Sequence, residues 1–155
     1  MIWQDDGFLL KIFKYSENSS IADFYTLNHG KTSGIVFGST SKKNKSYLVL
    51  GNKIHLNYSS KNENSTGNFK IEIAKINTPY FFDYSAKLNC INYVLDLVRN
   101  LTVENFTNRD IYRLLDKFFA NLHRSDWINK FVFWELDLFK SLGYEINYLN
   151  YVKKK

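Results

Sequence analysis

Pro79, the only proline in the chain, separates two parts with different hydrophobic periodicity. Before it, apolar and polar residues alternate in short runs, and the alternation is strict over residues 53–58. Alternation with period two is typical of strands with one buried face. After it, apolar residues recur every three or four positions, which indicates amphipathic helices. We therefore expect an α+β chain, with a strand-rich domain over residues 1–77 and a helical domain over residues 78–155.

Six runs in the first part are predicted as strands because turn-forming residues separate them. They cover residues 8–15, 21–27, 33–38, 47–50, 53–58 and 69–76. Short strands in close succession, without a helical pattern between them, favour a small closed barrel. The five-stranded oligonucleotide-binding barrel (OB-fold) is the expected form, and a single β-sandwich is the alternative.

Three helices are predicted in the second part. They start near Ser85, Thr107 and Ser125, whose hydroxyl groups can accept a hydrogen bond at a helix N-terminus. The third ends at Gly143, which suits a left-handed helix stop. Its apolar residues cover more than one face, so we expect the central helix of a small bundle. Glu135 lies within that apolar surface and is predicted to be a buried, hydrogen-bonded carboxylate with a structural role.

Charge and cysteine content narrow the possible partners. The chain has 21 Lys and Arg against 15 Asp and Glu, a net charge of +6 that favours an anionic partner. Cys90 is the only cysteine, so no disulfide framework or thiolate metal cage is expected, and Cys90 itself is predicted to be a small core residue. The N-terminal residues do not resemble a signal peptide, and no apolar run approaches the roughly 20 residues of a membrane span. We expect a soluble, cytoplasmic protein without membrane contact.

The polar segment 38–46 is the densest positive cluster and is predicted to be a loop between two strands. Its lysines are too close together to be buried, and they can converge on the phosphates of a nucleic acid. A solvated loop is the alternative interpretation. The predicted phosphate contacts are Lys42, Lys43, Lys45, Lys31, Lys11 and Lys14.

Aromatic residues near this segment can act as stacking platforms for bases, although aromatic residues in alternating strands more often belong to a core. The stacking candidates are Phe37, Tyr47 and Tyr58. In the second part, Arg109, Arg113 and Lys117 are spaced by four residues and form one basic stripe on a helix. This stripe is a candidate site for an acidic, aromatic-ended peptide tail of a partner, and a solvated helix face is the alternative.

Motifs for catalysis are missing from the sequence. The three histidines have no Ser, Cys or carboxylate in a motif that would work with them, and no glycine-rich phosphate loop occurs. Asp5 and Asp6 are the only adjacent acidic pair and are predicted to form a turn before the first strand. We therefore expect no catalytic residue, no metal and no cofactor.

Several short motifs follow one another along nearly the whole chain. They are Trp3-x-Asp5-Asp6-Gly7, Glu17, Thr26 to Lys31, Gly34 to Gly38 before the basic segment, Leu50-Gly51-Asn52, Tyr112-x-x-Leu115, and Phe133 to Gly143. In this order they resemble the bacterial recombination mediator family RecO. The resemblance implies an OB-fold barrel followed by a helical domain, and a DNA-repair function without enzyme activity.

The implied activities are binding of single-stranded and double-stranded DNA, annealing of complementary strands, and loading of the recombinase RecA onto DNA coated by single-strand-binding protein. The implied partners are RecR and the acidic C-terminal tail of the single-strand-binding protein, with RecA as an indirect partner, at the nucleoid in the bacterial cytoplasm. Family members commonly have a longer C-terminal part with a four-cysteine zinc site, and this sequence has no cysteine after Cys90. We expect a short form without metal. A protein-interaction adaptor and an RNA-binding barrel stay as alternative functions.

Overall fold

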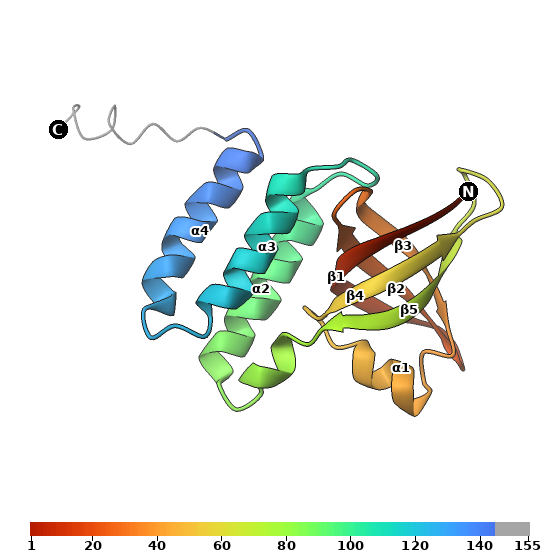
Figure 1. Ribbon diagram of the computed structural model, residues 1–155, viewed down its shortest axis with the longest axis horizontal. Coiled ribbons are helices and arrows are strands. Elements are labelled where there is room, and N and C mark those ends of the chain that lie inside the picture. Colours follow the sequence, from red (N-terminus) through yellow and green to blue (C-terminus); the bar gives the residue numbers. More distant parts are fainter. Residues whose placement is uncertain (145–155) are drawn as a thin grey trace. The chain divides into compact units, whose positions relative to one another are not determined.

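The computed structural model describes residues 1–144 (Figure 1). Its strands form a closed barrel in the order β1-β2-β3-β5-β4. They are β1 (Ile2–Ser16), β2 (Ser19–Thr26), β3 (Gly30–Phe37), β4 (Lys53–Ser59) and β5 (Gly67–Lys75). A closed barrel of five strands followed by helices is consistent with an OB-fold and a small helical region. The predicted fold class is confirmed, and the sandwich is excluded.

Two features close the barrel: the long strand β1 pairs with two neighbours, and two glycines lie opposite each other where β3 pairs with β5. β1 pairs with β4 along its first half and with β2 along its second half, with register shifts after Leu9 and after Lys14 that allow it to bend. β3 and β5 pair in parallel, and Gly34 lies opposite Gly67. A β-carbon at Gly34 would lie 2.6 Å from the ring of Phe69, so only glycine permits this close approach.

The barrel interior is filled by side chains from all five strands. The fully or nearly buried members of this core are Leu9, Ala22, Phe24, Val36, Ile54, Leu56, Phe69 and Ile71. Alternation along each strand directs these residues inward, as expected for a small barrel whose interior is packed with side chains.

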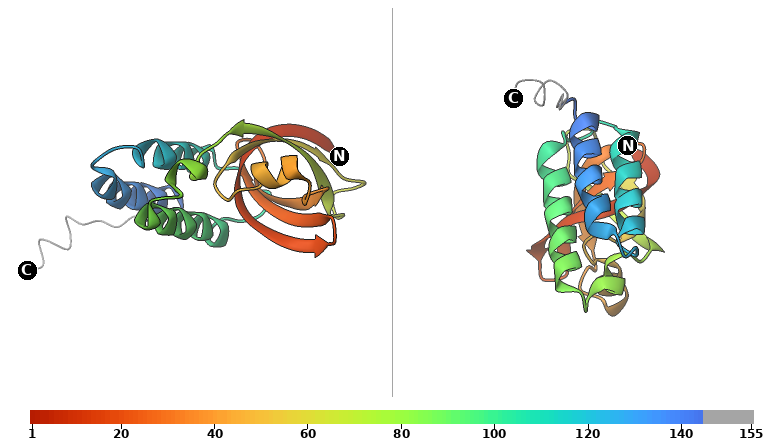
Figure 2. Two further views of the ribbon diagram at one scale, coloured as in Figure 1. Left: turned by 90° about the horizontal axis from the view of Figure 1, so that it is seen from below. Right: turned by 90° about the vertical axis from the view of Figure 1, so that its left-hand side faces the viewer.

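The basic segment 38–46 is a turn only over residues 38–41, and residues 47–50 are not a strand. The chain forms the short helix α1 (Lys42–Tyr47), which lies across one end of the barrel (Figures 1 and 2). Tyr47, Leu48 and Leu50 pack against the barrel core. Both predictions were wrong for one reason: the apolar run after the lysines covers the open end of the barrel instead of joining the sheet.

The helices of the second part occur within about two residues of their predicted starts. A 3-10 helix, η1 (Thr78–Phe81), is followed by α2 (Ser85–Leu101), α3 (Arg109–Asn121) and α4 (Trp127–Ser141). The predicted hydroxyl caps were wrong: Tyr84 and Asp126 precede α2 and α4 without a capping side chain, and the Thr107 hydroxyl donates to the carbonyl oxygen of Asn28. Gly143 has a φ of +88°, the left-handed conformation expected at the end of α4. The backbone forms two compact units, Met1–Tyr112 and a second one from Arg113 onward. A domain boundary between residues 77 and 78 stays a prediction.

Helix α4 differs from its expected burial. Only Trp134 and Leu138 are buried, while Ile128, Val132 and Phe133 are exposed. Burial on several faces was therefore wrong for this helix, and Glu135 is only partly buried. Lys153, Lys154 and Lys155 lie outside the described residues.

Candidate nucleic-acid interface

Helix α1 fixes the three lysines of the basic segment at the end of the barrel. Ser41 precedes the helix, and its hydroxyl oxygen accepts a hydrogen bond from the backbone N–H of Asn44 at 3.2 Å. Lys42, Lys43 and Lys45 are all exposed. Because they belong to a capped helix and not to a loop, their backbone positions are set before any ligand binds.

Next to α1 lies a hollow of about 340 Å³ that combines aromatic, amide and basic groups. Its walls come from the end of β3, the start of β5 and α1, and the residues are Val36, Phe37, Asn44, Asn68, Phe69, Lys70 and Ile71. Phe37 is 61% exposed, which makes its ring accessible to a ligand. Lys70 is also exposed, and only its outward position in an alternating strand would have indicated it.

The two other stacking candidates are placed differently. Tyr47 is partly buried at the end of α1, packs against the barrel core, and has the ammonium of Lys43 at 5.9 Å from its ring centroid. Tyr58 is partly buried and stacks on Trp3, with ring centroids 4.6 Å apart. Of the three predicted aromatic residues, Phe37 alone presents most of its side chain to solvent.

Lys31, Lys11 and Lys14 do not gather with the α1 lysines. The ammonium of Lys31 donates hydrogen bonds to the carbonyl oxygens of Arg99 at 2.8 Å and Thr102 at 2.6 Å, at the C-terminal end of α2. Lys11 lies 3.9 Å from Asp96, and Lys14 is exposed near the end of β1. A cation at a helix C-terminus also interacts favourably with the helix dipole, so Lys31 has a structural role that accounts for its position.

Part of the outer surface of β2 and β3 is covered by the segment from Arg99 to Asn108. The guanidinium of Arg99 donates to the carboxylate of Asp23 at 2.6 Å, and Ser33 donates to the same carboxylate at 2.6 Å. The hydroxyl of Tyr25 donates to the carbonyl oxygen of Asn108 at 3.2 Å, and burial raises the pKa of Tyr25 to about 12. Because of these contacts, nucleic-acid bases cannot reach this part of the sheet.

A row of partly buried and exposed apolar side chains crosses the neighbouring part of the same sheet. Phe13, Ile21 and Ile35 are register partners on β1, β2 and β3. Phe13 is exposed, and the guanidinium carbon of Arg99 lies 5.2 Å from its ring centroid. Phe13 was not predicted from the sequence as a surface residue. Its position two residues after Lys11, on the same outward side of the strand, would have indicated it.

A second hollow, also of about 340 Å³, contains an aromatic stack. Trp3 lies between His29, at a centroid distance of 4.0 Å, and Tyr58. Asp5 is buried, and its carboxylate lies 2.8 Å from the Nδ1 atom of His29. The same carboxylate accepts a hydrogen bond from the backbone N–H of Asn28 at 2.8 Å. Asp5 and Asp6 are therefore part of β1 and not of a turn, because partners from the β2–β3 turn and from His55 bind their carboxylates.

The basic stripe of α3 has partners along its length. Arg109 donates to the side-chain oxygen of Asn28 at 2.7 Å. Lys117 lies 3.8 Å from Asp137, with both side chains more than half exposed, and Arg113 is exposed. An exposed pair of this kind contributes little stability, so Lys117 can exchange its partner at low cost.

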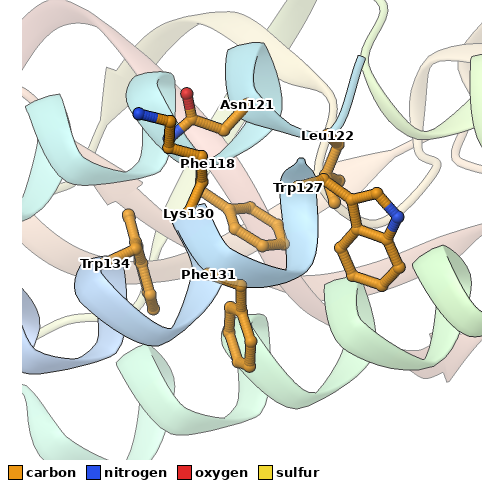
Figure 3. Close-up of a pocket in the computed structure, with 7 residues that line it drawn as sticks. All are labelled: Phe118, Asn121, Leu122, Trp127, Lys130, Phe131 and Trp134. Atoms are coloured by element: carbon orange, nitrogen blue, oxygen red, sulfur yellow. The ribbon is translucent and has the colours of Figure 1, made fainter. Parts of the chain in front are cut away.

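Between α3 and α4 the side chains leave a narrow pocket (Figure 3). Its residues are Phe118, Asn121, Leu122, Trp127, Lys130, Phe131 and Trp134. The indole N–H of Trp134 donates to the carbonyl oxygen of Leu114 at 2.6 Å, and its ring stacks on Phe131 with a centroid distance of 6.2 Å. The pocket does not admit a water molecule, so it is part of the packing between the two helices.

Within residues 1–144, no three His, Cys, Asp or Glu side chains come together as metal ligands would. None of the helices in the described part of the chain combines the length and hydropathy that a membrane span requires.

Comparison with known protein families covers nearly all of the sequence. The family model for the N-terminal part of recombination protein O matches residues 1–77, and the model for its C-terminal part matches residues 85–150. The chain belongs to the RecO family.

Similar proteins carry the same family name. The DNA repair protein RecO of Ehrlichia chaffeensis is 30% identical over 149 residues, which are 95% of this chain and 60% of that protein. The DNA repair protein RecO of Rickettsia felis is 29% identical over 144 residues, or 93% of this chain and 60% of the relative. That of Hyphomonas neptunium is 27% identical over 150 residues, or 95% and 62%. The chain thus spans about 60% of the length of these relatives.

Three of the motif residues that resemble the RecO family make structural contacts in the first compact unit. Asp5 binds His29, and Lys31 binds the end of α2. Asn52 accepts the backbone N–H of Asn77 at 2.9 Å. These motif residues therefore have structural roles in the fold. The candidate ligand site is the surface around α1.

Proposed function

We propose that this RecO-family chain is a DNA-binding recombination mediator that acts in DNA repair without enzyme activity. It binds single-stranded and double-stranded DNA, promotes annealing of complementary strands, and helps to load RecA onto DNA coated by single-strand-binding protein. It works at nucleoid DNA in the bacterial cytoplasm. The observation that carries the DNA contact is the group of three exposed lysines on α1, beside the hollow that contains Phe37 and Lys70.

The chemistry of this surface suits the backbone of a nucleic acid more than its base edges. Lysine ammonium groups contact phosphates as point charges and carry little geometric information about sequence. Phe37 can stack on an unpaired base next to the phosphates that the lysines bind. We therefore expect binding that depends strongly on salt and weakly on sequence.

Charge reversal on α1 tests this proposal. The variant K42E/K43E/K45E should bind a 30-nucleotide single strand at least about tenfold more weakly at about 50 mM salt, because three phosphate contacts are lost. The slope of log affinity against log salt should become shallower by about 2, since each phosphate contact to a single strand contributes about 0.7. Fluorescence anisotropy in a salt titration measures both values.

The control variant K61E/K130E/K140E has the same net charge and takes its lysines from the β4–β5 connection and from α4. It should lose less than about threefold, since a general loss of positive charge acts only through screened, long-range attraction. Equal losses in the two variants would remove α1 as the binding site. No measurable affinity of the wild type at low salt would favour the adaptor, and clearly tighter binding to RNA of the same sequence would favour the RNA-binding barrel.

The proposed protein partners are RecR and the acidic C-terminal tail of the single-strand-binding protein, with RecA engaged indirectly. Arg113 and Lys117 on α3 supply exposed positive charge for an acidic tail. The exposed apolar residues Val132 and Phe133 on α4 supply surface for aromatic or aliphatic groups of a partner.

A further inference from the structure

The segment that follows the barrel exposes several large apolar side chains in close succession. Ile76 is 46% exposed, Tyr80 65%, Phe82 56% and Tyr84 57%, while Phe81 between them is buried. Single exposed apolar residues are ordinary on a protein surface, but a contiguous group indicates a contact surface. These rings belong neither to the barrel interior nor to the lysine surface of α1, so their exposure needs a separate explanation.

The backbone of this segment is held firmly by the barrel. The side-chain amide of Asn77 donates to the carbonyl oxygen of Gly51 at 3.0 Å, and the hydroxyl of Thr78 donates to that of Leu50 at 2.5 Å. Both Asn77 and Thr78 are buried, and Pro79 fixes φ in the first turn of η1. The backbone N–H of Tyr84 donates to the carbonyl oxygen of Phe81 at 2.9 Å and closes the segment at its other end. The exposed rings therefore lie on a fixed support, which lowers the entropic cost of binding.

The hydrogen bonds of Asn77 and Thr78 also connect this segment to α1. Their acceptors, residues 50–52, follow α1 by only a few positions in the chain. Figure 2 (left) views this side of the structure, with α1 and η1 both toward the viewer. A ligand bound at the α1 lysines can therefore continue along this side toward η1 and the segment that follows it.

The charges around the rings favour an anion. The ammonium of Lys87 lies 5.1 Å from the ring centroid of Tyr84 and 5.5 Å from that of Phe81. Lys75 ends β5, is exposed, and is the register partner of Lys53 on β4. Asp83 is the only acidic residue between positions 76 and 84. Positive charge next to several accessible rings is the combination that binds single-stranded nucleic acids without sequence preference.

We propose that Tyr80, Phe82 and Tyr84 form a stacking platform for unpaired bases of single-stranded DNA, with Lys75 and Lys87 at the flanking phosphates. This platform lies outside the barrel and extends the α1 contact. It rests on the proposed function in that both sites bind the same strand. Duplex DNA does not use it, because paired bases are already stacked and their faces are inaccessible.

Ring removal tests the platform. The variants Y80A, F82A and Y84A should each weaken binding of a 30-nucleotide single strand by about fivefold to tenfold, the lower end of what one stacked base contributes. Affinity for a duplex of the same length should change by less than about twofold, and the salt slope for the single strand should stay the same because no phosphate contact is lost. Fluorescence anisotropy with both labelled ligands measures these values.

Two sets of controls separate stacking from other effects. F106A and F133A remove equally exposed rings elsewhere in the chain and should leave single-strand affinity unchanged. The exchanges Y80F, F82Y and Y84F keep a ring and should retain affinity within about twofold. Circular dichroism and thermal unfolding confirm that each variant is folded. Equal losses on single-stranded and duplex DNA would overturn the platform, because stacking requires unpaired bases.

The outcomes also distinguish this inference from the proposed function. If charge reversal on α1 abolishes binding and the ring variants do not change it, the platform is overturned while the α1 site stands. If the ring variants lose single-strand affinity and the α1 variant does not, the platform stands and the α1 site is overturned. If the wild type binds neither strand at low salt, both fail, and the exposed rings belong to a protein interface.

Discussion

Buried polar residues on the outside of the barrel are the most constrained individual positions. Asp23 is buried and receives hydrogen bonds from Arg99 and Ser33. Tyr25 is fully buried, and its hydroxyl donates to the backbone of Asn108. The Asp23 carboxylate and the Tyr25 hydroxyl are hydrogen-bonded to protein groups and not to water. Removing one of these partners leaves a buried polar group with a missing hydrogen bond, which lowers stability.

The raised pKa of Tyr25 predicts a specific response to alkaline pH. In the folded chain burial holds this pKa at about 12, whereas an unfolded tyrosine has a pKa of about 10. Between these pH values the unfolded state releases the proton and the folded state retains it, so the free energy of unfolding falls as pH rises. The loss should be steeper in wild type than in Y25F.

Urea unfolding at pH 9, 10 and 11 measures this difference, and the other tyrosines and lysines contribute equally to both proteins. Y25F should also be somewhat less stable at neutral pH because its hydrogen bond is gone. Parallel stability curves for the two proteins above pH 10 would show that the Tyr25 hydroxyl is not buried in solution.

At the scale of elements, alternation was sufficient to predict most of the barrel. β4 and β5 have clear period-two patterns, and their positions agree with the prediction to within about two residues. The first half of β1 was missed because Asp5 and Asp6 are typical of turns, and only their partners His29 and His55 explain acidic residues in a strand. Contacts between residues far apart in sequence cannot be inferred from a local pattern.

Helix α1 shows a second limit of local patterns. At six residues it is too short for a helical period to be recognised, and it has no buried residue. Lys42, Lys43 and Lys45 are nevertheless exposed, as their close spacing predicted. Phe13 and Lys70 lie on outward positions of strands, where sequence alone does not distinguish a ligand contact from ordinary solvent exposure.

The basic stripe on α3 gives a prediction at this scale. If it receives the acidic tail of a single-strand-binding protein, R113E/K117E should weaken binding of an acidic, aromatic-ended nine-residue peptide by about tenfold, since charge-assisted contacts are lost. The control K130E/K140E changes the same charge on α4. Fluorescence anisotropy of the labelled peptide measures its affinity for the two variants. Equal affinities would mean that the stripe is a solvated helix face and not the peptide site.

At the scale of the whole chain, residues beyond the barrel decide which part of the barrel surface a ligand can reach. Arg99, Thr102 and Asn108 bind groups on β2 and β3, the strands on which OB-folds commonly hold oligonucleotides. The α1 end, the Phe37 hollow and η1 are outside this covered area. The proposed site therefore depends on the first compact unit, Met1–Tyr112, and not on the strands alone.

Fragments of the chain test this dependence. A fragment of residues 1–112 should unfold cooperatively, since it contains every partner of Asp23, Lys31 and Tyr25 named above. A fragment of residues 1–77 should be less stable by about 3 kcal/mol or more, because Phe8 and Tyr25 become exposed once Tyr112 and Asn108 are removed. Urea unfolding of the two fragments gives the comparison, and equal stabilities would instead make residues 1–77 an independent domain.

The order in which the strands pair has a consequence for synthesis of the chain on the ribosome. β1, β2 and β3 can form a three-stranded sheet as soon as they emerge, but the outer edges of β1 and β3 obtain their partners only from β4 and β5. At about 5 to 20 residues per second, the edges stay open for roughly 2 to 8 seconds, until residue 75 has emerged. During that interval the nascent sheet can pair with other chains, so production of this protein should benefit from slow expression or from chaperones that shield strand edges.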